Sequence, residues 1–380
     1  MSRRLLLACG VAAAVVLAAP VMGQIRAALR AAFPGQFVRI VGVSVALAVA
    51  ALIGAALLRI RERRRPRYAA IAASLGIAVL YGLATATGQP QVDAVERVHF
   101  VEYGVITFLF YRVWSARGDL SSFLLPLLAG FLAGTLDEWL QWFVPNRVGE
   151  ARDVLLNLVA ICCGLLFSAG VEPPPAWRPA PSRASLRQVC RLGALVSVVF
   201  AAFVHTVHLG YDVADPEIGI FRSHSRRDEL LALSADRAAR WRSDPPLALR
   251  RFSREDQYMD EGLWHVQHRN DVWRERQYGK AWKENLILER YFAPVLDTPS
   301  YAARGSSRWT PEQRAEAAAR GAADPMPFVS EAQPYPILTW KKPLLWGATL
   351  LWSLTLSAWT WPRPASSPAS PSASGSPRCP

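Results

Sequence analysis

The sequence has few cysteines and lacks the short motifs of common catalytic and metal sites. It contains 5 Cys in 380 residues, and none lies between Arg191 and Arg378. The polar stretch 211–338 must therefore fold without disulfides, even in an oxidising compartment. No H-E-x-x-H or similar motif is present, and no Ser or Cys accompanies His99 at a recognisable spacing. We therefore expect no metal and no cofactor, and the sequence shows no ready nucleophile.

Acidic residues are also scarce relative to basic ones. The chain has 43 Lys and Arg against 30 Asp and Glu, a net charge of +13. Such an excess is typical of nucleic-acid-binding proteins. However, the stretch 211–338 holds 19 basic and 20 acidic residues, so it is close to neutral. The excess lies in loops beside apolar runs, and we expect no nucleic-acid partner.

Long apolar runs are what the sequence has in abundance. Hydrophobic residues make up 52% of the chain, yet the mean hydropathy is only +0.14, so apolar and polar segments must be segregated. Uncharged runs of about 17 to 21 residues are long enough to cross a bilayer. They occupy residues 5–21, 40–58, 68–88, 120–136, 154–171 and 343–361. With two more polar candidates, 98–114 and 192–209, we predict an all-α polytopic membrane protein of about eight spans.

The predicted spans divide the chain into parts and set its orientation. Arginines cluster on one side of the membrane if eight helices alternate, which predicts a cell-membrane protein with a cytoplasmic N-terminus. The parts are 1–67, two spans and a basic cytoplasmic loop; 68–171, a four-helix membrane unit; 172–188, a Pro-rich linker; 189–210, a span; 211–338, a helical extracytoplasmic domain; 343–361, a span; and 362–380, a disordered tail.

Polar residues at the ends of three neighbouring apolar helices form the candidate site. Ionisable groups are costly in hydrocarbon and persist there when they form ion pairs, contact water or have a function. Gly130, Gly134, Asp137 and Gln141 share one helical face, so small residues bring the polar ones close to the next helix. The candidate catalytic residues are His99, Glu102, Asp137 and Glu138, and the candidate binding residues are Gln141, Arg147, Asp153 and Asn157.

These residues allow three interpretations. A histidine beside carboxylates could work as general base and acid on a lipid-linked substrate. Arg147 could bind an anionic headgroup or a peptide. In the third interpretation, Asp137, Glu138 and Asp153 pair with Arg147 and Arg152 and have a structural role.

Three ordered segments resemble the VanZ-like family of membrane proteins. They are HFVEYGVITFLFYR, GTLDEWLQWFVPNR and ARDVLLNLVAICCG, and the similarity covers about residues 68–170. The resemblance implies an integral membrane protein of the cell envelope, with a link to resistance to the glycopeptide teicoplanin. It implies no particular reaction. The positions it carries over are His99, Glu102, Tyr103, Asp137, Glu138, Gln141, Pro145, Arg147, Asp153 and Asn157.

The leading functional hypothesis is a non-catalytic envelope protein. Its polar cluster would bind or organise a lipid headgroup, a peptide or a partner, with membrane lipids as its surroundings. The alternatives are a membrane hydrolase or transferase and a proton-coupled transporter. Two histidine pairs could also hold a metal, namely His205 with His208, and His265 with His268 and Asp271. An interfacial position explains the first pair better, and exposure or packing against Trp264 and Trp273 explains the second better.

Overall fold

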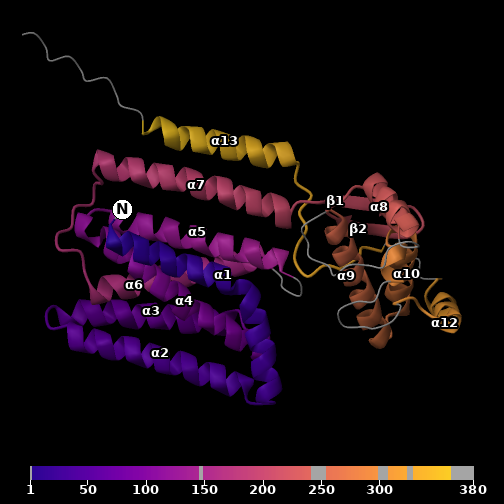
Figure 1. Ribbon diagram of the computed structural model, residues 1–380, viewed down its shortest axis with the longest axis horizontal. Coiled ribbons are helices and arrows are strands. Elements are labelled where there is room, and N and C mark those ends of the chain that lie inside the picture. The colour runs from indigo at the N-terminus through magenta and orange to yellow at the C-terminus, as the bar shows by residue number, and fades with distance from the viewer. Residues whose placement is uncertain (1, 145–148, 241–253, 298–306, 323–327, 361–380) are drawn as a thin grey trace, which may run out of the picture.

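The long helices of the protein lie side by side in one bundle, and a smaller domain sits at one end of it (Figure 1). The computed structural model describes residues 2–144, 149–240, 254–297, 307–322 and 328–360. The bundle consists of α1 (Arg3–Ala32), α2 (Phe37–Arg59), α3 (Arg64–Ala84), α4 (Pro90–Trp114), α5 (Ser121–Phe143), α6 (Ala151–Val171), α7 (Arg183–Val207) and α13 (Lys342–Ala358). The smaller domain contains β1 (Tyr211–Asp215), β2 (Gly219–Ser223), α8 (Arg227–Arg240), α9 (Arg254–Arg274), α10 (Tyr278–Tyr291), α11 (Ala293–Leu296) and α12 (Pro311–Gly321).

Six of the described helices are long and apolar enough to cross a bilayer: α1, α2, α3, α5, α6 and α7. Helix α4 packs against α1, α2, α5 and α6, but it carries Asp93, Glu96, Arg97 and Glu102. Helix α13 is shorter, at 17 residues, and packs along α7. The architecture is that of a mostly helical, multi-pass membrane protein.

Glycines set the close approach of the central helices. A Cβ atom on Gly134 of α5 would lie 3.1 Å from Cβ of Asn157 on α6. A Cβ atom on Gly164 of α6 would lie 3.0 Å from the Cα atom of Gly104 on α4. Small residues at these positions let the helix backbones approach within the membrane. The polar residues on the same faces are thereby drawn together.

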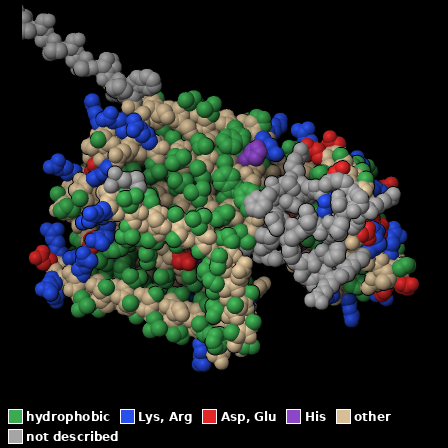
Figure 2. All heavy atoms as spheres, in the orientation of Figure 1, with side chains coloured by type: hydrophobic (Ala, Val, Ile, Leu, Met, Phe, Trp, Pro, Cys, Tyr) green, Lys and Arg blue, Asp and Glu red, His purple; other side chains and the backbone are tan. Residues whose placement is uncertain are grey.

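Arginines gather at the end of the bundle opposite the smaller domain (Figure 2). Arg59 and Arg112 both pair with Glu172, at 2.8 Å and 3.2 Å. Arg67 Nε donates to the carbonyl of Gly170 at 2.8 Å. The loops between α2 and α3, after α4, and after α6 therefore meet at one end, as an alternating path through the bundle requires.

Helix α7 begins earlier than predicted, at Arg183, inside the segment 172–188 that we expected to be a linker. Ser182 caps it by accepting a hydrogen bond from the Ser185 amide at 3.1 Å. Ser185 Oγ also donates to Asp119, just before α5, at 2.9 Å. This local capping extends the helix beyond the apolar run. The predicted disordered tail, 362–380, lies outside the described residues.

The prediction of an all-α fold is wrong in one place, where the smaller domain begins with a β-hairpin. Strands β1 and β2 are antiparallel, with Val213 opposite Phe221. Alternate residues of both strands are buried. Gly219 closes the turn with φ of +127°, a conformation that favours glycine. The period-two pattern of a half-buried strand explains the hairpin.

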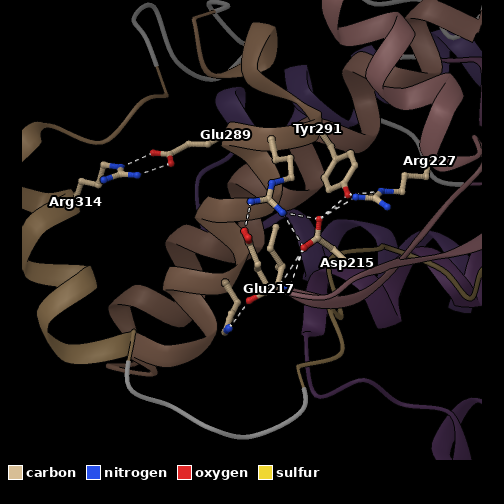
Figure 3. Close-up of polar contacts among 9 residues, drawn as sticks. Asp215, Glu217, Arg227, Glu289, Tyr291 and Arg314 are labelled. Atoms are coloured by element: carbon tan, nitrogen blue, oxygen red, sulfur yellow. Dashed lines mark hydrogen bonds and ion pairs between the residues drawn. The ribbon is translucent and has the colours of Figure 1, made fainter.

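The rest of the domain is helical, with a core between the hairpin, α9 and α10. Its buried residues include Phe221, Tyr258, Ile287 and Phe292. The carboxylate of Asp215, at the end of β1, is fully buried and binds Arg290 at 2.7 Å and the Tyr291 hydroxyl at 2.7 Å (Figure 3). This cluster joins the hairpin to α10.

Candidate functional site

Helix α4 contributes His99, Glu102 and Tyr103 to the site. The rings of His99 and Tyr103 stack, with centroids 6.0 Å apart. The fully buried Tyr103 hydroxyl donates to Asp137 Oδ2 at 3.0 Å. Glu102 is half-buried, and its charge interacts with that of Asp137. These residues occupy one stretch of α4 facing α5.

Helix α5 contributes a carboxylate pair held by an amide. Gln141 Nε2 donates to Asp137 Oδ2 at 3.1 Å and to Glu138 Oε1 at 3.2 Å. Asp137 and Gln141 are 5% exposed, and Glu138 is fully buried. The spacing of three and four residues places all three on one side of the helix, one turn apart.

Helix α6 completes the cluster with Asn157 and Asp153. Asn157 is fully buried and donates to Glu138 Oε1 at 3.4 Å. It also lies beside His99. Asp153 is half-buried one turn earlier, and its charge interacts with that of Glu138. The carboxylate–amide cluster, as we name it, therefore comprises His99, Glu102, Tyr103, Asp137, Glu138, Gln141, Asp153 and Asn157.

Three buried polar atoms of the cluster lack a hydrogen-bond partner among the described residues. They are Glu138 Oε2, Asn157 Oδ1 and His99 Nδ1. No ion pair joins Asp137 or Glu138 to a cation in the described parts of the chain. Burying an unpaired carboxylate is costly, so such a group takes up a proton or a cationic partner. In the same described parts, no group of three His, Cys, Asp or Glu is arranged to hold a metal.

The expected pairing with arginines is partly wrong. Arg152 pairs with Glu96 of α4 at 2.8 Å, and not with Asp137, Glu138 or Asp153. Adjacent residues on a helix point in directions about 100° apart, so Arg152 faces the start of α4 while Asp153 faces the cluster. Pro145 and Arg147, which the family resemblance carried over, lie outside the described residues.

Two charged residues at the site were not predicted. Arg26 of α1 interacts electrostatically with Glu102 and His99. No local pattern pointed to Arg26, because its place depends on how α1 packs against α4. Glu150 precedes α6, and burial together with the charge of Asp153 raises the pKa of Glu150 to about 7. Its position three residues, or about one helical turn, before Asp153 was a signal in the sequence.

The smaller domain rests on the helix ends beside the cluster. Trp142 Nε1 of α5 donates to the Tyr335 hydroxyl at 2.7 Å. His208 Nε2 accepts from the Ala151 amide at 3.0 Å, and its Nδ1 donates to the carbonyl of Pro336 at 2.8 Å. These two bonds require the neutral form of His208. Burial lowers the pKa of His208, which favours the same form.

The histidine pairs considered as metal sites are engaged elsewhere. His205 accepts a hydrogen bond from Trp346 Nε1 at 2.9 Å, away from His208. His265 binds Glu284 at 2.6 Å, within the domain core. Asp271 pairs with Arg274. Within the described residues, these pairs therefore serve packing and the links between elements.

The fold and this cluster define a multi-pass helical membrane protein with a buried polar site at the domain end of its bundle. The family model VanZ/LLP1 matches residues 80–171, so this part of the chain is a VanZ/LLP1 domain. The resemblance drawn from the sequence is thereby confirmed. The domain runs from the end of α3 to the end of α6 and includes every residue of the carboxylate–amide cluster. No curated protein and no solved structure matches the chain.

Proposed function

We propose that the chain is an eight-span protein of the cell envelope that binds a positively charged group of an envelope component at the carboxylate–amide cluster. The observation that carries the proposal is the gathering of four carboxylates, with acceptor atoms of Glu138 and Asn157 that receive no hydrogen bond from any described residue. An ammonium group supplies three N–H donors and one positive charge, which suits such a site.

Eight spans would place the cluster outside the cytoplasm. Helix α4 packs against α1, α5 and α6, which would shield the polar side chains of the cluster from lipid. Helix α13 extends about 25 Å at 1.5 Å per residue, close to the thickness of the hydrocarbon core. With both counted as spans, the arginine-rich end would face the cytoplasm. The cluster and the smaller domain would then share the extracytoplasmic side.

A membrane hydrolase or transferase is the second candidate. The Nδ1 atom of His99, which has no hydrogen-bond partner among the described residues, favours it, because a free imidazole nitrogen can accept a proton. Against it, no hydrogen bond joins His99 to a described serine or cysteine. Binding therefore explains more of the features of the site than catalysis does.

Mass spectrometry of the full-length protein purified in mild detergent would test the proposal. An amine-bearing component should co-purify with the wild type and be lost from Glu138→Gln, which keeps the side-chain shape but removes the charge. Glu62→Gln, at the other end of the bundle, is the matched control. Equal retention by both variants, with both folded, would contradict the proposal. Teicoplanin susceptibility of cells with and without the chain would measure the resistance role that the resemblance implies.

A further inference from the structure

A large apolar cleft opens between α2, α3, α4 and α6, on a different face of α4 from the carboxylate–amide cluster. Its volume is about 830 Å³. Its walls include Val49 of α2, Val79 of α3, Phe108 of α4 and Phe167 of α6. Polar atoms are few along it, since Ser74 Oγ is bound to the carbonyl of Cys163 at 2.7 Å. A cleft of this kind is a poor place for water, which needs polar partners.

The cleft exists because α2 is held at its two ends and stands away from the bundle between them. At one end, Phe37 is buried and lies 4.9 Å from the guanidinium of Arg30. At the other, Ala56 and Ile60 pack with Ile71. Nearly all the remaining residues of α2 are exposed or half-buried. Opposite them, small residues on α3 and α4 leave the space open, as Gly82 and Gly104 have nothing within 4 Å of an added Cβ.

Basic residues lie at both ends of this apolar cleft. Arg59 lines one end and is already paired with Glu172 at 2.8 Å. Arg97 lines the other end, is exposed, and forms no ion pair with any carboxylate that the structure describes. From Arg97 to Phe108 the lining of α4 runs roughly 16 Å at 1.5 Å per residue. That is about half of the hydrocarbon core, the depth of the chains of one leaflet.

We propose that the cleft is a binding site for a bilayer phospholipid with an anionic headgroup. Its acyl chains would lie between α2 and α4, and its phosphate would pair with Arg97. The apolar walls match the acyl chains of a phospholipid, and the length of the cleft matches the depth of one leaflet. Arg97 at the mouth of the cleft matches an anionic headgroup. This site is separate from the proposed binding function, because His99 and Tyr103 lie on the other side of α4.

Native mass spectrometry of the full chain in mild detergent tests this lipid site, with added phosphatidylglycerol as the probe. Gly82→Leu fills the cleft and should lower phosphatidylglycerol retention about fivefold or more. Gly76→Leu is the matched control, since it lies on the same helix, has nothing within 4 Å of an added Cβ, and does not line the cleft. Gly104→Leu repeats the test from α4 should Gly82→Leu fail to fold.

The headgroup is tested by Arg97→Gln. This variant should lose the preference for phosphatidylglycerol over phosphatidylcholine while keeping the lipid stoichiometry of the wild type. Equal retention by the filled and control variants would overturn the proposal. So would stronger retention of a long-chain isoprenyl phosphate than of phosphatidylglycerol, or a dimer in place of a lipid-bound monomer. Loss of the amine-bearing component from Glu138→Gln is a separate readout, so failure of one proposal leaves the other standing.

Discussion

His224 has a charge state that its hydrogen bonds determine. Its Nδ1 donates to Glu261 at 2.5 Å, and its Nε2 donates to the carbonyl of Val207 at 2.9 Å. An imidazole that donates from both nitrogens is protonated. Burial alone would lower the pKa of His224, but the hydrogen bond and charge of Glu261 outweigh it and raise the pKa. His224 thus links the domain to the end of α7 through a charged pair.

This pair predicts a pH dependence of stability. Because the folded pKa of His224 is raised above 6.5, the stability it contributes is complete below that pH. It is lost as the pH rises through the folded pKa. The free energy of unfolding of the full-length protein in detergent should therefore fall over this range. His224→Phe should remove the slope, and an unchanged slope would contradict the assignment.

Asp215 makes the opposite prediction at acid pH. Burial would raise the pKa of Asp215, but hydrogen bonds from Tyr291 and Arg290 lower it to about 2. Its contribution to stability is therefore present above pH 3.8 and lost as the pH falls towards 2. Asp215→Asn should cost about 1–3 kcal/mol near neutral pH, because an NH2 donor replaces one of the two acceptor oxygens and the charge opposite Arg290 is lost. Denaturant unfolding would measure the loss; a cost within error would show that the cluster is dispensable.

At the scale of helices, the contact between α5 and α6 decides whether the cluster forms. A leucine at Gly134 would push against Asn157 and separate the two helices. Overpacking of this kind costs about 1–3 kcal/mol. We expect Gly134→Leu to lower the midpoint of thermal unfolding in detergent, whereas Gly10→Leu, with nothing within 4 Å of an added Cβ, should not. Equal midpoints would show that α5 and α6 can move apart freely.

The β-hairpin was not predicted, because the sequence analysis assigned only helices to this domain. Val213 and Asp215 alternate with exposed residues, and Phe221 and Ser223 do the same after the turn. Each strand has five residues, too short to stand out beside helical segments. Pro216 and Gly219 between them were a turn signal in the sequence. The helical character of the rest of the domain, where the periodicity is stronger, was predicted.

For the whole molecule, the positive-inside rule predicts which end is exposed to the cell exterior. In a cysteine-free background, Thr87→Cys lies in the loop between α3 and α4, at the domain end. Glu62→Cys lies in the arginine-rich loop between α2 and α3. A membrane-impermeant thiol reagent applied to intact cells should label Thr87→Cys and spare Glu62→Cys. The reverse pattern would invert the proposed topology.

Much of the site was predictable from spacing, because helical periodicity alone places Asp137 beside Gln141 on one face. The cross-helix contacts were only partly predictable. The sequence predicted that three neighbouring helices share the cluster, but it did not predict that Tyr103 of α4 binds Asp137 of α5 or that Arg26 comes from α1, far away in the sequence. The partner of Arg152 was mispredicted because a loop arginine can reach several acids, and only packing selects among them.

The sequence by itself determined the membrane class, the long helices and which faces of α5 and α6 are polar, since hydropathy and periodicity are local properties. The tertiary structure decided which acids of the described residues are left without cations, which end the domain covers, and that α2 stands off to open a cleft. Those features depend on contacts between distant segments, and no local pattern encodes the distance between two helices.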